Sequence, residues 1–147
     1  MSTVLICVQD EILLPTRATP FHIGWSMFTP RDFGIDSGEI YNLNSGIKCY
    51  IPLGWCGVIT PTTKLGEHGL LIVGGVKYLN PNSSAEIKIQ IVNLMDDTIL
   101  VDKNEHLFDI HFQPYLIGDG AKRDYSEPLV EIVADRELFK NFDRQFI

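Results

Sequence analysis

A chain of 147 residues fits a single domain, and its 45% hydrophobic and 21% charged residues are typical of an ordinary soluble globular protein. A formal net charge of −7 argues against an extended nucleic acid as a partner, although a small nucleotide can still bind in a pocket. The longest apolar runs are too short for a bilayer, and no basic region precedes the N-terminal apolar stretch, so we expect neither a membrane partner nor a signal peptide. Three cysteines without a C-x-x-C pair, namely Cys7, Cys49 and Cys56, predict reduced thiols in a cytoplasmic protein, or in a host cytoplasm or nucleus if the source is viral.

Short apolar segments separated by turns make up almost all of the chain as far as Tyr115. Strands are expected at Thr3–Val8, Glu39–Leu43, Gly46–Ile51, Trp55–Thr60, Gly69–Tyr78, Ala85–Asn93, Thr98–Val101 and Leu107–Phe112. In Ala85–Asn93, isoleucines alternate with polar residues, which is the period of a half-buried strand. Evenly spaced strands without a helical pattern between them predict an all-β sandwich, barrel or jelly roll.

The tail has a different pattern, so we divide the chain into a β domain of residues 1–116 and a C-terminal tail or arm of residues 117–147. Leu129–Val133 is a possible strand, and Asp135 can cap a short helix that follows it. Its apolar face would consist of Leu138, Phe139, Phe142 and Phe146. These side chains need burial, either on their own subunit or on a neighbouring one.

The order of several motifs resembles that of the trimeric deoxyuridine triphosphatases (dUTPases). Ile35-Asp36-Ser37-Gly38-Glu39 is similar to the family's I-P-P-G-E turn. Ser45-Gly46-Ile47, followed by Ile51-Pro52-Leu53-Gly54-Trp55, is similar to its T-G-I and I-P-x-G-Y segments. The resemblance implies an all-β, distorted jelly-roll (β-clip) subunit and a homotrimer with active sites at the subunit contacts. It also implies magnesium-dependent cleavage of dUTP to dUMP and pyrophosphate.

The first two family motifs are altered in this chain. The first, A-G-x-D, reads Ile23-Gly24-Trp25-Ser26, so a serine stands where the family has an acid that helps to hold the metal. The second, P-R-S-G, reads Pro61-Thr62-Thr63-Lys64. Thr63 can donate a hydrogen bond and Lys64 can supply positive charge, but neither offers the bidentate fork of arginine.

The remaining three motifs are altered as well. Asn80, or Leu79 after a shift of one residue, occupies the position of the acid that activates water, and an amide cannot take that proton. Asn80 and Asn82 are also explained as simple turn formers. The fourth motif's glutamine is Asp109, and nothing in the tail resembles the arginine- and glycine-rich fifth motif.

These changes lead to the hypothesis of a catalytically inactive, viral or phage dUTPase-like protein that does not turn over dUTP. It would use no cofactor and would sequester a nucleotide, such as a cyclic or signalling nucleotide, in inter-subunit clefts. The ligand-binding residues expected on this hypothesis are Trp25, Ser26, Thr63, Lys64, Tyr78, Asn80, Asn82 and Asp109.

Two alternatives stay open. The fold and its tail could serve as a scaffold that binds a protein of the host. The chain could also be a divergent dUTP or nucleotide pyrophosphatase, in which Asp109 or Glu67 replaces the missing acid, and only in that case could Mg²⁺ be a cofactor. The four histidines show no metal-ligand spacing, so no metal site is expected, and His68 and His106 are interpreted as exposed turn residues.

Overall fold

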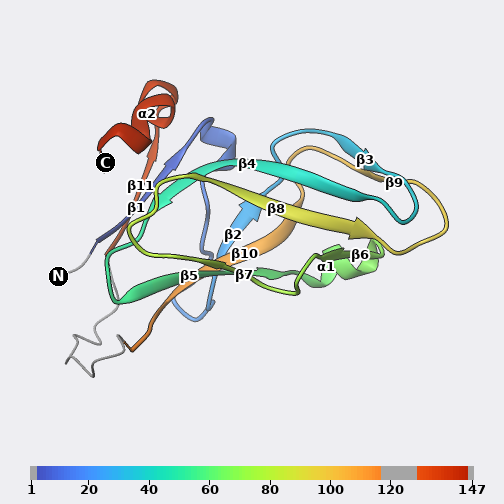
Figure 1. Cartoon of the computed structure of the whole chain (residues 1–147), viewed down its shortest axis with the longest axis horizontal. Coiled ribbons are helices and arrows are strands. Elements are labelled where there is room, and N and C mark those ends of the chain that lie inside the picture. The colour runs from blue at the N-terminus through green and yellow to red at the C-terminus, as the bar shows by residue number, and fades with distance from the viewer. Residues whose placement is uncertain (1–2, 117–128, 146–147) are drawn as a thin grey trace.

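Strands dominate the computed structural model, which describes residues 3–116 and 129–145 (Figure 1). The strands are β1 Thr3–Val8, β2 Trp25–Phe28, β3 Phe33–Ile35, β4 Ile40–Tyr50, β5 Trp55–Pro61, β6 Leu70–Ile72, β7 Lys77–Leu79, β8 Glu86–Asn93, β9 Ile99–Val101, β10 His106–Pro114 and β11 Leu129–Ala134. The helical segments are η1 Glu11–Leu13, α1 Thr63–Glu67, α2 Arg136–Asn141 and η2 Phe142–Gln145. The predicted all-β class with a short C-terminal helix is confirmed.

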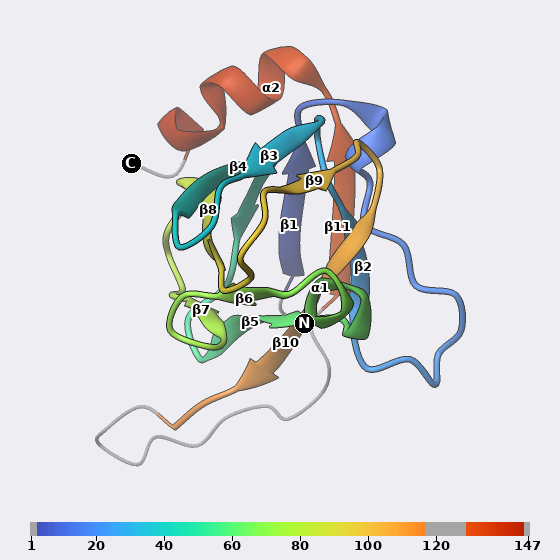
Figure 2. The same cartoon turned by 90° about the vertical axis from the view of Figure 1, so that its right-hand side faces the viewer.

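Two sheets face each other across the hydrophobic core. One has the strand order β11-β1-β4-β8-β6 and the other the order β2-β10-β5-β7, while β3 and β9 form a separate ribbon. Figure 2 shows β4 and β8 on the opposite side of the molecule from β5 and β10. Inward side chains of the two sheets meet between them, among them Ile6, Ile89, Ile59 and Ile110, each at most 2% exposed. This is the jelly-roll arrangement that the family resemblance implies.

Strand β4 is longer than predicted. It joins the two expected strands Glu39–Leu43 and Gly46–Ile51 into one strand of 11 residues. Its register with β8 shifts between Asn44 and Lys48, and Gly46 has a φ of 73° at this irregularity. A glycine permits this left-handed conformation, so the chain bulges without leaving the sheet.

The expected strand Gly69–Tyr78 is in fact two strands that belong to different sheets. β6 pairs with β8, whereas β7 pairs with β5. Gly74 and Gly75, with φ values of 89° and 88°, turn the chain between them. As a result, β7 and β8 diverge after they leave their connecting turn, although the apolar pattern had suggested a simple pair.

The C-terminal segment closes the edge of the five-stranded sheet. β11 runs parallel to β1, and α2 follows it. The predicted cap is confirmed, because the Asp135 carboxylate accepts a hydrogen bond from the Leu138 amide at 3.0 Å. Phe139 and Phe142 are buried in a cluster with Cys7.

A buried lysine fixes α2 to this sheet. Lys48 Nζ donates to the Phe139 carbonyl oxygen at 2.8 Å and lies 3.2 Å from an oxygen of Asp143. The same ammonium lies 4.5 Å from the centre of the Phe139 ring. The helix is therefore covered by its own subunit, while Phe146 lies outside the described residues.

Two further findings concern thiols and membranes. Cys7, Cys49 and Cys56 are all free thiols, as expected. Of the helices in residues 3–116 and 129–145, none has the length and apolar character needed to cross a membrane.

We expect Gly46→Ala to destabilise the protein by about 2–4 kcal/mol, because the added Cβ would meet both a backbone and a packing penalty. The φ of 73° disfavours any side chain, and the new Cβ would lie 2.5 Å from Cδ1 of Leu13. Gly38→Ala is the matched control, since Gly38 has a φ of 74° but nothing within 4 Å of its Cβ position. Urea unfolding of both variants should show the larger loss of unfolding free energy for Gly46→Ala. Equal losses would show that crowding against Leu13 does not contribute.

Candidate active site

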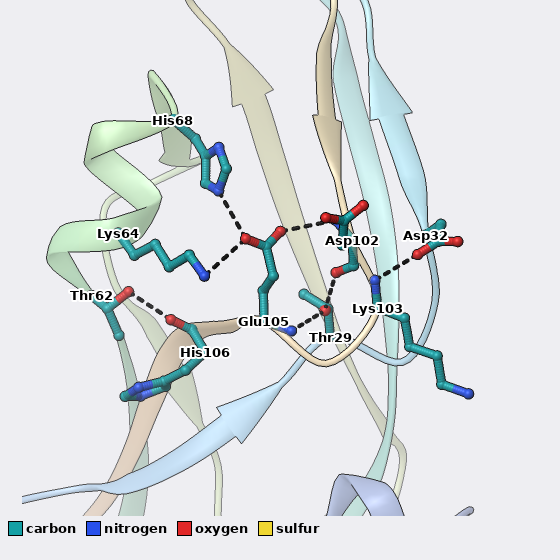
Figure 3. A network of polar contacts seen from close by, with 9 residues as sticks. All are labelled: Thr29, Asp32, Thr62, Lys64, His68, Asp102, Lys103, Glu105 and His106. Carbon is teal, nitrogen blue, oxygen red and sulfur yellow. Dashed lines mark hydrogen bonds and ion pairs between the residues drawn. The ribbon is translucent and has the colours of Figure 1, made fainter.

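Polar side chains gather where α1 meets the start of β10. We use the name α1–β10 cluster for Thr62, Lys64, His68, Glu105, His106 and Asp109. Lys64 Nζ lies 2.9 Å from Glu105 Oε1, and His68 Nε2 lies 3.2 Å from the same oxygen (Figure 3). The other Glu105 oxygen accepts from the Asp102 amide at 2.9 Å. The Glu105 side chain is only 14% exposed, so the residue that binds both Lys64 and His68 is largely buried.

The turn that carries Glu105 is fixed by a buried threonine. Thr29 Oγ1 accepts from the Glu105 amide at 2.8 Å and donates to the Asp102 carbonyl oxygen at 2.7 Å. The Lys103 amide donates to Asp32 at 2.7 Å on the far side of the same turn (Figure 3). These bonds satisfy the backbone of the turn and hold Glu105 under Lys64.

Electrostatics keep Glu105 ionised. Burial raises its pKa, but the hydrogen bonds from Lys64, the Asp102 amide and His68 outweigh burial and lower the pKa below its usual value. A lowered folded-state pKa means that ionisation stabilises the fold above the ordinary glutamate range. That contribution is lost as the pH falls through the folded-state pKa.

We therefore expect Glu105→Gln to reduce the free energy of unfolding by about 1–3 kcal/mol at neutral pH, because it weakens charge-assisted hydrogen bonds. The deficit should shrink in acid, where wild-type Glu105 becomes protonated as well. Urea unfolding of both proteins at neutral pH and below the glutamate range measures this difference. A deficit that is the same at both pH values would show that the charge of Glu105 is not responsible.

Asp109 lies on the outer face of the four-stranded sheet. Its neighbours along the strand, Phe108 and Ile110, are each 2% exposed and point into the core. In the registers of β10, Asp109 is opposite Ser26 on one side and Thr60 on the other. The Asp109 carboxylate on β10 is therefore directly opposite Ser26 of the first motif on β2.

A pocket of about 340 Å³ opens where β7 and β8 diverge. This volume lies within the range of small-molecule sites, which is about 300–1,000 Å³. It is lined by Cys49, Ile51, Lys77, Tyr78, Leu79, Asn80, Ser83, Ala85, Glu86, Ile87 and Lys88. Burial raises the pKa of Cys49 to about 12, so its neutral thiol forms an apolar wall with Ile51 and Ile87. Amide, hydroxyl and charged groups surround that wall, and we call this feature the β7–β8 pocket.

Within one chain, the predicted site residues fall into two groups. Ser26 and Asp109 are opposite each other on the outer face, and Asp109 belongs with Lys64 to the α1–β10 cluster. Tyr78 and Asn80 line the β7–β8 pocket instead. None of the residues that line the pocket belongs to the α1–β10 cluster, so one subunit does not bring the two groups into one pocket.

Three predicted residues lie beside these groups. Thr63 is exposed at the start of α1. Trp25 packs against the core with the Arg17 guanidinium 5.6 Å from its ring centre. Asn82 is a turn residue with a φ of 56°, and its side chain accepts from the Tyr50 hydroxyl at 3.1 Å.

Sequence reasoning missed His106. It was interpreted as an exposed turn residue, but it begins β10, and its Nε2 lies 2.6 Å from Asp109 Oδ1. Residues three apart in a regular strand point to opposite faces. A register shift between His106 and Phe108 brings the two side chains together, and a single sequence gives no signal for that shift.

Two facing sheets in this strand order define a jelly-roll protein. The dUTPase family profile matches residues 10–119, so the chain belongs to the dUTPase family. A deoxyuridine 5'-triphosphate nucleotidohydrolase of Corynebacterium jeikeium is 30% identical over 127 residues, which cover 85% of this chain and 82% of that protein. The Lactococcus lactis enzyme of the same name is 24% identical over 123 residues, with 79% and 82% covered.

Solved structures agree with this assignment. The crystal structure of dUTPase from Streptococcus mutans has a TM-score of 0.68 and 27% identity, covering 77% of this chain and 94% of that one. A Staphylococcus bacteriophage 80alpha dUTPase with dUpNHpp has a TM-score of 0.72 at 14% identity, covering 86% and 98%. At that identity, the second likeness shows the fold alone.

These relatives correct the functional hypothesis. The prediction of an inactive, nucleotide-sequestering protein without dUTP turnover is wrong, because the curated relatives across most of the chain are nucleotidohydrolases. The same finding goes against the alternative of a protein-binding scaffold. The prediction judged each motif position alone, without the neighbours that strand pairing supplies, such as Asp109 opposite Ser26.

The family resemblance implies magnesium, but the described residues do not form a dedicated magnesium site. Among residues 3–116 and 129–145, no three His, Cys, Asp or Glu side chains are grouped so as to hold a metal ion. Mg²⁺ prefers carboxylate oxygen, and the first motif offers the Ser26 hydroxyl. We therefore assign no residue as a magnesium ligand and derive no step through the metal.

Proposed function

We propose that this protein is a pyrophosphohydrolase that cleaves dUTP to dUMP and pyrophosphate. The observation that carries the proposal is the dUTPase family match over residues 10–119. It is supported by relatives in Corynebacterium jeikeium and Lactococcus lactis that are named deoxyuridine 5'-triphosphate nucleotidohydrolases. Of the functions considered from the sequence, the divergent pyrophosphatase is the one that agrees with these relatives.

The β7–β8 pocket is the proposed site of the base. Its apolar wall suits a flat heterocycle, and the Asn80 amide can donate to and accept from polar atoms on the edge of a base. Tyr78 lines the pocket with an aromatic ring, and this residue is 61% exposed. Asn82 would hold the turn beside the pocket through its bond with Tyr50.

The α1–β10 cluster is the proposed site of the triphosphate. Lys64 supplies the cation, with half of its side chain (49%) exposed, and Thr63 supplies an exposed hydroxyl donor. Ser26 and Asp109 form the adjoining part of this face, and Trp25 supports it from the core side. Each of these roles follows from the side chain's chemistry and position.

We further propose that the complete site needs a second copy of the chain. The pocket and the cluster share no residue within one chain, so we expect the pocket of one subunit to meet the cluster of its neighbour. A homotrimer that closes on itself would contain three equivalent sites of this kind.

Pyrophosphate release from dUTP, with dTTP, dCTP and UTP as comparators, tests the proposed activity. The expected result is turnover of dUTP at about 1 per second or faster, as is ordinary for enzymes. The comparators should be cleaved more slowly. Absence of turnover with all four nucleotides would contradict the proposal.

Lys64→Ala should lower kcat/KM for dUTP by about 10- to 100-fold, because it removes a charge-assisted contact with the phosphates worth about 1.5–3 kcal/mol. Lys103→Ala is a matched control on the neighbouring turn, where its side chain points away from Glu105 (Figure 3). Steady-state kinetics should leave the control close to wild type. Equal losses in both variants would indicate a general effect of surface charge.

A further inference from the structure

We propose that His106 and Asp109 form a catalytic dyad, in which His106 takes the proton of the attacking water. This inference rests on the proposed dUTP hydrolysis and assigns the base that the third motif lacks. Asn80 cannot fill that role, because a side-chain amide is too weak a base to take a proton from water. Imidazoles held by a carboxylate are general bases in many hydrolases.

The geometry of the pair is specific. His106 Nε2 lies 2.6 Å from Asp109 Oδ1, which is the distance of a short charge-assisted hydrogen bond. The two side chains are 39% and 34% exposed, so a substrate can reach them. Both are nevertheless placed by β10, which is paired on both sides by β2 and β5.

A strand irregularity creates the pair. His106 and Asp109 are three residues apart and would point to opposite faces of a regular strand. The register shift between His106 and Phe108 allows both Leu107 and Phe108 to be buried in succession, at 0% and 2% exposure. It thereby turns His106 onto the outer face with Asp109. Bulges next to active sites commonly redirect a side chain in this way.

Hydrogen bonding sets the tautomer that a base requires. An ionised Asp109 accepts from the Nε2–H group, which leaves Nδ1 as the nitrogen with the free lone pair. Within the described part of the chain, no hydrogen bond to His106 Nδ1 is found. The ring also packs against Phe28, with 5.8 Å between ring centres, which limits its orientation.

The dyad adjoins the proposed phosphate site. The Thr62 hydroxyl donates to the His106 carbonyl oxygen at 3.1 Å, which joins α1's entry to the start of β10. Glu105, the residue before His106, binds Lys64 (Figure 3). The charged group that contacts the imidazole is Asp109 on its own strand, whereas the ring points away from the Lys64–Glu105 ion pair (Figure 3). A phosphate chain bound at Lys64 would reach a water at His106 across this backbone contact.

The chemical step is a balanced hydrolysis. The water oxygen forms a bond to the α-phosphorus while one water proton passes to His106 Nδ1, and Asp109 stabilises the resulting imidazolium. The bond from the α-phosphorus to the bridging oxygen breaks, and its electron pair leaves with pyrophosphate. The proton is returned to solvent after the products depart. The step needs no further co-reactant from the protein.

His106→Ala tests the dyad, with His111→Ala as the matched control. His111 follows on the same strand and face, and its partner is Gln113 rather than a carboxylate. We expect His106→Ala to lower kcat for dUTP by about 10²–10⁴-fold, with a small change in KM, and added imidazole to restore part of the rate. His111→Ala should retain wild-type kcat.

Two further readouts separate a base from a structural residue. The fall of wild-type kcat/KM toward acid pH should disappear in the residual activity of His106→Ala, and Asp109→Asn should lower kcat while thermal unfolding stays cooperative. If His106→Ala does not fold, His106→Gln takes its place in the same assays. A variant at His106 that keeps wild-type kcat overturns the dyad while the proposed function stands. A wild-type protein without turnover overturns both.

Discussion

A one-to-one mixture of the Lys64→Ala and Ala85→Trp variants is expected to hydrolyse dUTP faster than either variant does alone. Lys64→Ala damages the α1–β10 cluster, and Ala85→Trp fills the β7–β8 pocket, which Ala85 lines. If each site combines the cluster of one subunit with the pocket of another, random trimers contain intact sites. About a quarter of the sites should be intact, because each needs one subunit of each kind in the correct place.

The measurement is pyrophosphate release at dUTP concentrations below KM, after the two proteins exchange subunits in mild denaturant. Mixing each variant with itself under the same conditions is the control. Recovery to a substantial fraction of the wild-type rate would support a site built between subunits. If the mixture stays at the average of the two variants, the pocket and the cluster work within one chain, and the proposed trimeric site is wrong.

Phe142→Ala should lower the free energy of unfolding by about 3–5 kcal/mol, which is typical of removing a buried aromatic ring. Phe142 is 0% exposed and packs with Phe139 and Cys7 where α2 docks. Urea denaturation measures the loss. Arg144→Ala, an exposed position two residues later, should change stability by less than about 0.5 kcal/mol. A loss below about 1 kcal/mol at Phe142 would mean that α2 is not part of the cooperative fold.

Much of the fold follows from residue patterns that act locally. The alternation in Ala85–Asn93 predicted β8, and Asp135 followed by spaced apolar residues predicted α2. The division between β6 and β7 was missed because apolar residues stand on both sides of Gly74 and Gly75, and the two glycines do not indicate which sheet each half joins. Sheet membership depends on distant partners, so a local pattern cannot decide it.

The candidate site was less accessible to sequence reasoning. Lys64, Asn80 and Asp109 were identified because they occupy motif positions, but their grouping depends on strand register. Asp109 faces Ser26 only through the pairing of β10 with β2, and His106 meets Asp109 only because the register shifts between them. One sequence contains neither fact. Counting altered motif residues led to a conclusion about activity that the curated relatives contradict.

The claim that this protein hydrolyses dUTP can be tested through the products formed in ¹⁸O-labelled water. Purified protein is incubated with dUTP and magnesium in this water, and the products are analysed by mass spectrometry. We expect dUMP that carries one ¹⁸O atom, together with unlabelled pyrophosphate, because water attacks the α-phosphorus. dUTP that stays intact through a long incubation would contradict the claim.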